Sequence, residues 1–349
     1  MPVFTHPEFD SHELIAFRHD RDSGLKAIIA VHNTRLGPGL GGCRMWPYAD
    51  EGEALTDVLR LSRGMTYKAA LAGLPQGGGK SVILGDPRRE KTEAMMRAMG
   101  RFVQTLSGKY IVAEDSGTNV DDIKLMAQET SHVGGLAGEA AVKAGRTGDP
   151  SPATAYGVFV GIKSAVSFKL KREDLSGLRV AIQGVGNVGY RLAKHLHDAG
   201  AKLWVTDIYA PAVERCVKDF GAIAVPMDAI HAVDVDVFAP CALGAILNDR
   251  TIPDLKAPIV AGAANNQLAR PAHDRILLDR KVLYAPDYVI NGGGIIEIYH
   301  ETVGYDHAKA HAHLDRIGDT LTSIFERSEK EKHPTGAIAD RMAEEIFRK

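Results

Sequence analysis

Residues 179–189, RVAIQGVGNVG, decide the fold of the second half of this chain: an apolar strand runs into glycines at 184, 186 and 189. The next residues carry apolar side chains at helical spacing up to Gly200, and a second strand over 202–206 ends at Asp207. Such a glycine pattern is weak evidence when it stands alone. The complete order of strand, turn, helix, strand and acid predicts a dinucleotide-binding unit.

Each glycine of this turn has a separate physical task. Gly184 permits the tight turn, Gly186 lets the backbone approach a pyrophosphate, and Gly189 allows helix and strand to pack closely. The helix that begins near Asn187 and Val188 offers unpaired N–H groups and the positive end of its dipole to the phosphates. The alternative interpretation is a purely structural turn between strand and helix.

Asp207 lies 18 residues beyond Gly189, where a carboxylate can accept hydrogen bonds from a ribose diol. Residues 208–211, IYAP, supply no arginine or lysine for a 2′-phosphate. We therefore expect NAD rather than NADP as the cofactor.

The alternation of strands and helices extends over the rest of the chain and predicts an α/β fold. We expect a Rossmann-type, doubly wound parallel sheet over residues 151–330 and a mixed α/β domain over residues 1–150. A C-terminal helix over 331–349 is expected to pack back toward the first domain. The glycine-rich stretch 134–150 has no apolar stripe, so we expect a mobile hinge or lid and the domain boundary there.

Apolar periodicity also predicts the individual elements. In the first domain we expect strands at 26–32, 81–84 and 110–113, helices at 53–71, 92–106 and 121–130, and a turn over 37–42. In the second domain we expect a helix from Ala153, strands at 179–183, 202–206, 222–225, 235–239, 258–261 and 282–285, and mainly helix from 294 onward.

Composition excludes several classes of function. The 349 residues carry 42 Lys and Arg against 44 Asp and Glu, which gives no electrostatic footprint for nucleic acid or an anionic membrane. No apolar run approaches the roughly 20 residues of a membrane span, and the N-terminus has no secretory signal. Three widely spaced cysteines indicate neither a disulfide framework nor a zinc site. We expect a cytoplasmic protein.

Lys80 follows three glycines in LPQGGGKS, residues 74–81. A phosphate-binding P-loop needs a glycine six residues before its lysine and a helix after it, but position 74 is leucine and a strand follows. This excludes a kinase or NTPase site. Loss of solvation among glycine and apolar surfaces favours the neutral amine that a general base requires. An ordinary exposed lysine after a flexible loop is equally compatible with the segment.

Two further segments combine charged residues with apolar surroundings. Lys68, near the end of the helix expected over 53–71, either reaches solvent or binds a carboxylate. Glu114 and Asp115 end the strand 110–113, a position that suits either a site in an α/β fold or a cap for the next helix. These isolated signals leave both alternatives open.

Taken together, the segments resemble the Glu/Leu/Phe/Val family of amino-acid dehydrogenases, and within it most closely the leucine dehydrogenases. The resemblance covers about residues 25–345 and rests on several motifs in one order. The motifs are LGPGLGGCR at 36–44, GMTYK at 64–68, GGGK at 77–80, AED at 113–115, the glycine turn at 184–189, APCALG at 239–244, GAANNQL at 262–268 and YAPDYVIN at 284–291.

The resemblance implies NAD-dependent oxidative deamination of an L-amino acid and gives roles to matching positions. Lys80 resembles the catalytic lysine that assists attack of water on an iminium carbon, and Asp115 resembles its partner in proton transfer. Lys68 resembles the group that holds the substrate carboxylate, aided by backbone N–H groups near Gly41 and Gly42. The other implied contacts are Met65 and Asn266 for the substrate, and Thr154, Ala239, Cys241 and Asn265 for the cofactor.

The resemblance also implies which residues meet the substrate side chain: Leu40, Ala113, Ile295 and Ile298. Two isoleucines fill space, which favours leucine, valine or isoleucine over an aromatic ring, but one methylene in an apolar pocket is worth only about 1–3 kcal/mol. Gly39, Gly292 and Glu297 stand where these enzymes usually carry Ala, Ala and Asn. Phenylalanine or tryptophan is therefore an alternative substrate.

Other functions have weaker support. His300, His307, His311 and His313 lack a completing cysteine or acidic ligand in sequence, so we expect a solvated helix face and no metal. A non-catalytic NAD-binding regulator is a rival interpretation, as is a 2-hydroxy-acid dehydrogenase, whose His–acid relay matches no motif here. The family assembles as homo-oligomers, so self-association is expected.

Overall fold

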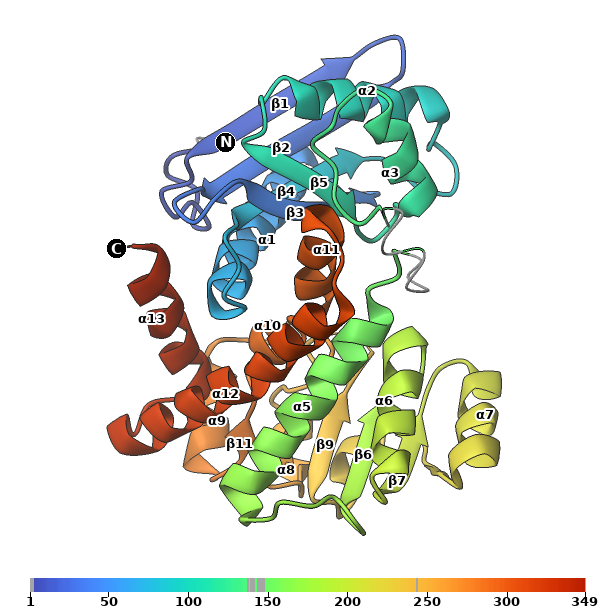
Figure 1. The fold of residues 1–349 in the computed structure, drawn as a ribbon, viewed down its shortest axis with the longest axis vertical. Coiled ribbons are helices and arrows are strands. Elements are labelled where there is room, and N and C mark those ends of the chain that lie inside the picture. Colours follow the sequence, from blue (N-terminus) through green and yellow to red (C-terminus); the bar gives the residue numbers. More distant parts are fainter. Residues whose placement is uncertain (1–2, 137, 139–141, 143–147, 243, 349) are drawn as a thin grey trace. The chain divides into compact units, whose positions relative to one another are not determined.

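The computed structural model describes residues 3–136, 138, 142, 148–242 and 244–348, which form two compact units (Figure 1). Unit 1 comprises Met1–Asp149, Ile298–His307 and Ala343–Lys349, and unit 2 comprises Pro150–Glu297 and Ala308–Met342. Much of the loop expected over 134–150 lies outside the described residues.

Unit 1 is built around a five-stranded sheet. Its strands are β1 Leu14–Asp20, β2 Leu25–Asn33, β3 Gly39–Trp46, β4 Gly77–Leu84 and β5 Tyr110–Glu114, and its helices include α1 Glu51–Leu71, α2 Glu93–Gln104 and α3 Val120–Ala127. The strand order is β1-β2-β4-β3-β5. β2 pairs antiparallel with β1 and β4, whereas β3 runs parallel to β4 and β5.

Alternating side chains of β2 divide unit 1 into two packed layers. Ile28 and Ala30 belong to a buried cluster with α1 residues such as Val58. Ala27 and Ile29 belong to the opposite cluster, which the apolar residues of α2 and α3 complete. Because both faces of the strand are covered, its sequence is a nearly continuous apolar run rather than an alternating one.

Strand β3 begins inside the glycine-rich stretch for which the sequence predicts a turn. That prediction is wrong for residues 39–42, and the physical reason is close approach between strands. A Cβ on Gly41 would lie 1.7 Å from the carbonyl oxygen of Gly79, and one on Gly42 would lie 2.4 Å from that of Glu114. Glycine is needed here because the neighbouring backbones leave no room for a side chain.

Unit 2 contains a six-stranded sheet in which all neighbouring strands are parallel. The strands are β6 Arg179–Gln183, β7 Lys202–Thr206, β8 Ile223–Ala224, β9 Val237–Pro240, β10 Ile259–Val260 and β11 Leu283–Tyr284. Their order is β11-β10-β9-β6-β7-β8, so the chain reverses its direction of winding next to β6. This is the doubly wound order, which confirms the predicted α/β fold class.

The helices after residue 150 belong mostly to unit 2. They are α5 Ser151–Leu170, α6 Asn187–Asp198, α7 Ala210–Phe220, α8 Thr251–Asp254, α9 Ala272–Asp279, α10 Asp287–Ile290, α11 Gly293–Val303, α12 His307–Glu331 and α13 Thr335–Phe347. Residues 298–307 and 343–349, which include parts of α11 and α13, belong to unit 1. α5 and α6 lie side by side (Figure 1). Among the described residues, no helix is both long enough and apolar enough to cross a membrane.

Candidate active site

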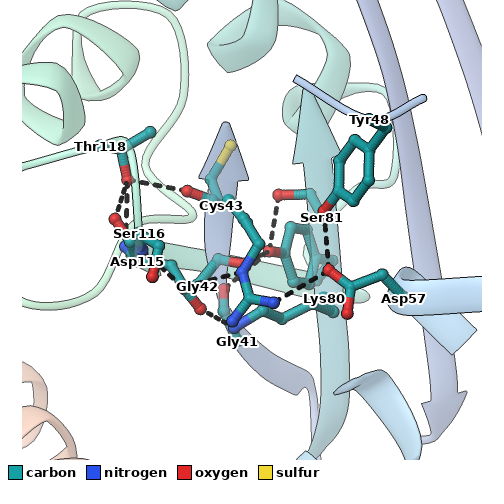
Figure 2. Close-up of polar contacts among 12 residues, drawn as sticks. Gly41, Gly42, Cys43, Tyr48, Asp57, Lys80, Ser81, Asp115, Ser116 and Thr118 are labelled. Carbon is teal, nitrogen blue, oxygen red and sulfur yellow. Dashed lines mark hydrogen bonds and ion pairs between the residues drawn. The ribbon is translucent and has the colours of Figure 1, made fainter. Parts of the chain in front are cut away.

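Lys80 lies in the middle of β4, on the face of the sheet that α1 covers. It lies two residues before Val82 on the same strand face, and Val82 belongs to the apolar cluster of α1. Only 6% of the lysine side chain is exposed, and its amine contacts Oδ2 of Asp115 (Figure 2). Backbone pairing with β2 and β3 fixes the strand on both sides. The alternative of an exposed lysine after a flexible loop is therefore excluded.

Asp115 follows the last residue of β5, and both of its carboxylate oxygens are held. Oδ2 contacts the Lys80 amine, while Oδ1 accepts hydrogen bonds from the Ser116 backbone N–H and from Nε of Arg44 at 3.3 Å. Burial alone would raise the pKa of this carboxyl. The charges of Lys80 and Arg44, together with the hydrogen bonds, outweigh burial and hold the pKa well below its usual range. Asp115 is therefore an anion at neutral pH.

The turn after Asp115 does not use this carboxylate to cap the next helix. Asn119 caps α3, because its side chain accepts the backbone N–H of Asp122 at 3.0 Å. The Thr118 hydroxyl donates to the carbonyl of Cys43 at 2.7 Å and so ties the turn to β3. The capping alternative that the sequence left open is excluded for Asp115.

Arg44 is a second cation of the site, and sequence reasoning missed it. It extends from β3, and its Nη1 lies 2.9 Å from Oδ2 of Asp57 on α1. The Tyr48 hydroxyl donates to the same oxygen at 2.7 Å. A usable signal was present, because Arg44 ends the motif LGPGLGGCR at 36–44, which also holds Gly41 and Gly42.

Tyr110 is a further residue that sequence reasoning missed. It is fully buried at the start of β5, and its hydroxyl donates to the carbonyl of Gly41 at 2.7 Å and lies 3.0 Å from Oγ of Ser81. A Cβ on Gly79 would lie 2.5 Å from the tyrosine ring. Because residues 79 and 81 flank Lys80, Tyr110 supports β4 from the face opposite the lysine.

The residues expected to bind the substrate carboxylate lie on α1 and β3. Lys68 is half-buried in the last turn of α1, with the half-buried Met65 one turn before it. α1 approaches β4 closely, because a Cβ on Gly78 would lie 2.2 Å from the backbone nitrogen of Thr66. Gly41 and Gly42 are buried in β3.

Three of the four residues expected to line the side-chain pocket lie in unit 1. Leu40 and Ala113 are buried, and Ile298 is half-buried. A Cβ on Gly134 would lie 3.3 Å from the Ile298 side chain and 3.4 Å from the Leu40 side chain, so both side chains pack next to Gly134. Ile295 is buried in unit 2.

The glycine turn of unit 2 has the geometry that a pyrophosphate requires. Gly184 has a φ of +92°, and a Cβ on Gly189 would lie 1.9 Å from the carbonyl oxygen of Gly184. Gly186 is the N-cap of α6 without a side-chain cap bond, and no heavy atom lies within 4 Å of its Cβ position. Asn187 and Val188 open the helix. This open helix N-terminus suits an anionic group.

Asp207 follows β7 and points back to the same turn. Its Oδ2 accepts the backbone N–H of Val185 at 2.8 Å, and its Oδ1 accepts that of Tyr209 at 2.9 Å. A carboxylate has about four acceptor positions, so these bonds leave capacity for a ribose diol. The residues of the turn therefore fit NAD.

The other residues expected to contact the cofactor, together with Asn266, which is expected at the substrate, divide into three groups. Ala239 and Cys241 adjoin the glycine turn, since a Cβ on Gly184 would lie 2.9 Å from the Cys241 backbone carbon. Asn265 and Asn266 are exposed beside each other, and Asn266 adopts a left-handed φ of +52°. Thr154 lies on α5, where its hydroxyl donates to the carbonyl of Pro150 at 2.9 Å.

The two cysteines nearest the expected site residues are not reactive as thiolates, and the described residues offer no metal site. Burial raises the pKa of the Cys241 thiol to about 12 and that of Cys43 to about 12, so neither is a thiolate at neutral pH. The described residues contain no group of three or more His, Cys, Asp or Glu side chains that could hold a metal ion.

Comparisons with known proteins identify the family of the chain. Residues 12–132 match the model of the Glu/Leu/Phe/Val dehydrogenase dimerisation domain, and residues 145–209 and 210–340 match that of the Glutamate/Leucine/Phenylalanine/Valine dehydrogenases. Leucine dehydrogenase of Geobacillus stearothermophilus is 52% identical, over 99% of this chain and 93% of the relative. Valine dehydrogenase of Streptomyces virginiae is 44% identical, over 97% and 95%.

A solved structure extends the likeness to three dimensions. The crystal structure of L-tryptophan dehydrogenase from Nostoc punctiforme matches with a TM-score of 0.85 and 45% identity, over 97% of this chain and 96% of that one. The family expected from the sequence motifs is confirmed, and the chain belongs to the Glu/Leu/Phe/Val dehydrogenases.

Proposed function

We propose that the chain catalyses the reversible, NAD-dependent oxidative deamination of a branched-chain L-amino acid to the 2-oxo acid, ammonia and NADH. The observation that carries this proposal is the buried contact between Lys80 and Asp115, in a chain 52% identical to a leucine dehydrogenase. A buried lysine with an acidic partner is the arrangement that proton transfer at a reacting carbon requires.

The charges of the substrate define the first roles. A zwitterionic amino acid needs a cation for its carboxylate, which Lys68 supplies together with backbone N–H groups at Gly41 and Gly42. Hydride loss requires a neutral substrate amine, and the later attack of water requires neutral Lys80, so each of the two cations releases one proton, which their mutual repulsion favours. NAD, when bound, accepts the hydride that leaves the α-carbon.

Lys80 and Asp115 act in the second half of the reaction. Loss of hydride leaves an iminium carbon, and neutral Lys80 takes a proton from the water that attacks it. The contact between the two side chains gives that proton a direct path to Oδ2 of Asp115. Asp115 then protonates the amine as it leaves. Lys80, neutral again, takes the hydroxyl proton as the carbonyl forms. One water is consumed, and the products are the 2-oxo acid, NADH, ammonium and one proton.

The walls of the site support a branched aliphatic side chain. Leu40 is buried and Ile298 is half-buried, and both lie near the Cβ position of Gly134. Such side chains offer apolar contact but fill the space that an aromatic ring needs. Tryptophan is the second candidate, because the chain is 45% identical to a solved tryptophan dehydrogenase.

Initial rates of NADH formation test both candidates. The panel is L-leucine, L-valine, L-isoleucine, L-phenylalanine and L-tryptophan, with 2-hydroxyisocaproate as the hydroxy-acid control. We expect the highest kcat/KM with a branched-chain substrate and no NADH with the hydroxy acid. A higher kcat/KM with tryptophan or phenylalanine would overturn the assignment of a branched-chain substrate. If no amino acid gives NADH although NAD binds measurably, the result would favour the rival interpretation of a non-catalytic NAD-binding regulator.

The cofactor proposal rests on Asp207 and the open position at Gly186. A 2′-phosphate would meet the negative charge of Asp207, which weakens NADP binding. We expect kcat/KM for NAD to exceed that for NADP by about 100-fold or more, as one buried charge conflict is worth several kcal/mol. Equal values would contradict the assignment.

Self-association is part of the same proposal. Residues 12–132 match a model described as a dimerisation domain, which supports a homo-oligomer without fixing its size. Light scattering on the purified chain measures the mass directly. We expect a multiple of the 37.6 kDa chain mass, and a monomer at micromolar concentration would contradict the proposal.

A further inference from the structure

The guanidinium of Arg44 bridges two carboxylates from different elements. Its Nε lies 3.3 Å from Oδ1 of Asp115, and its Nη1 lies 2.9 Å from Oδ2 of Asp57 on α1. Tyr48 donates to the same oxygen of Asp57 at 2.7 Å. Arg44 is thus anchored on one side by α1 and holds the carboxylate at the end of β5 with the other.

This bridge restricts the orientation of Asp115. A carboxylate that ends a short side chain can rotate and exchange its two oxygens. Here Oδ1 is occupied by Arg44 and by the Ser116 N–H, which leaves Oδ2 directed at the Lys80 amine. Rotation would break two charge-assisted contacts at once, and such contacts are about twice as strong as neutral hydrogen bonds.

We propose that Arg44 is a positioning residue: its guanidinium, anchored by Asp57, holds Oδ1 of Asp115 so that Oδ2 alone exchanges protons with Lys80. The inference rests on the proposed function of that pair. A planar fork with separate N–H edges can contact both carboxylates, whereas the single ammonium of a lysine cannot keep that geometry.

The charge of Arg44 also acts on Asp115. The groups around this carboxylate that carry or acquire charge are Lys80 on β4, Arg44 and Cys43 on β3, Tyr48, Asp57 behind Arg44, Glu114 and Tyr110 on β5. Lys80 and Arg44 are the cations among them, and both lower the pKa of Asp115. Loss of the Arg44 cation raises this pKa and also removes positive charge near Lys80. Both changes favour a protonated Lys80–Asp115 pair, so the acid limb of the pH profile moves to higher pH.

Two substitutions separate the effect of orientation from the effect of charge. Arg44→Gln removes both, and we expect kcat/KM for the amino acid to fall about ten- to hundredfold, the value of a hydrogen bond to a charged group. Its acid limb should move to higher pH. Arg44→Lys keeps the charge and loses the fork, so kcat/KM should stay low while the acid limb moves less. The affinity for NAD should not change in either variant.

Chemical rescue supplies a readout that a purely structural role would not move. Arg44 lines a cavity of about 370 Å³ with Tyr48, Asp57 and Ser116, and 26% of its side chain is exposed, so a soluble guanidinium ion can reach its position. We expect guanidinium at concentrations below those that unfold the protein to restore part of the turnover of Arg44→Ala. It should not restore the turnover of Lys80→Ala.

Arg179→Gln is the matched control, because Arg179 pairs with Asp236 at 2.8 Å in unit 2. It breaks a comparable ion pair and should leave kcat/KM and the pH profile at wild-type values. Wild-type kinetics in Arg44→Gln would overturn the inference, as would a fall in activity with an unmoved acid limb and no rescue of Arg44→Ala. Full activity of both Lys80→Ala and Asp115→Asn would instead overturn the proposed function itself.

Discussion

Replacing Gly41 with alanine would insert a methyl group into the backbone of the neighbouring strand. The Cβ would lie 1.7 Å from the carbonyl oxygen of Gly79, 2.7 Å from its carbonyl carbon and 3.4 Å from the Cα of Lys80. No rotamer change relieves this overlap, because every one of the contacted atoms belongs to the backbone. β3 and β4 must therefore move apart at the position that carries Lys80.

The size of the movement follows from the contact distances. Ordinary van der Waals contact of a Cβ begins at 3.4 Å, so the strands must separate by roughly 1.7 Å at this point. Overpacking of this kind costs about 1–3 kcal/mol of folding free energy. A displacement of about 1 Å at a catalytic group lowers the rate about 100-fold, so we expect kcat/KM for L-leucine to fall by at least that factor.

Gly64→Ala is the control, because Gly64 lies on α1 with no heavy atom within 4 Å of its Cβ position. Alanine is favoured over glycine in a helix by about 1 kcal/mol, so this variant should be slightly more stable with unchanged kcat/KM. Urea unfolding gives the stability, and circular dichroism confirms that the assayed protein is folded. A Gly41→Ala variant with wild-type stability and wild-type kcat/KM would refute the close packing of β3 and β4.

Three further predictions follow from other contacts. Tyr110→Phe loses the hydrogen bond to the Gly41 carbonyl, and we expect kcat/KM to fall about tenfold while the NAD dissociation constant, measured by fluorescence titration, stays the same. Burial lowers the pKa of His32 to about 4, and a nearby histidine adds to this, so the folded protein resists protonation below 6.5 while the unfolded chain accepts it. The free energy of unfolding should fall by up to about 3 kcal/mol between pH 6.5 and pH 4, and a flat urea-unfolding profile would contradict this. Gly189→Ala would bring a methyl group to 1.9 Å from the Gly184 carbonyl oxygen and should weaken NAD binding at least tenfold, which an unchanged NAD titration would disprove.

The sequence predicts unit 2 better than unit 1, and strand pairing explains the difference. In unit 2 each strand is a local apolar run followed by a turn and, in several cases, a helix, so neighbours in sequence reveal the elements. In unit 1 the strand β3 is glycine-rich, and its local pattern indicates a turn. Its strand character comes from pairing with β4 and β5, which lie about 40 to 70 residues further along the chain.

The residues of the candidate site also differ in how well the sequence predicts them. Lys80 and Asp115 stand out in sequence because charged residues interrupt apolar strands, and the motifs around them recur within a family. Arg44 is marked only by its place at the end of the motif at 36–44, and Tyr110 has no such local signal. Arg44 acts through Asp115, 71 residues away, and Tyr110 through a carbonyl 69 residues away. Partners at such separations become visible only when the fold brings them together.

The turnover number of Lys80→Ala with saturating L-leucine and NAD tests the central claim most directly. General acid–base catalysis contributes about 10²- to 10⁴-fold, so we predict a fall in kcat of that size with an unchanged NAD dissociation constant. A variant that forms NADH at the wild-type rate would contradict the assignment of proton transfer to the buried pair on β4 and β5.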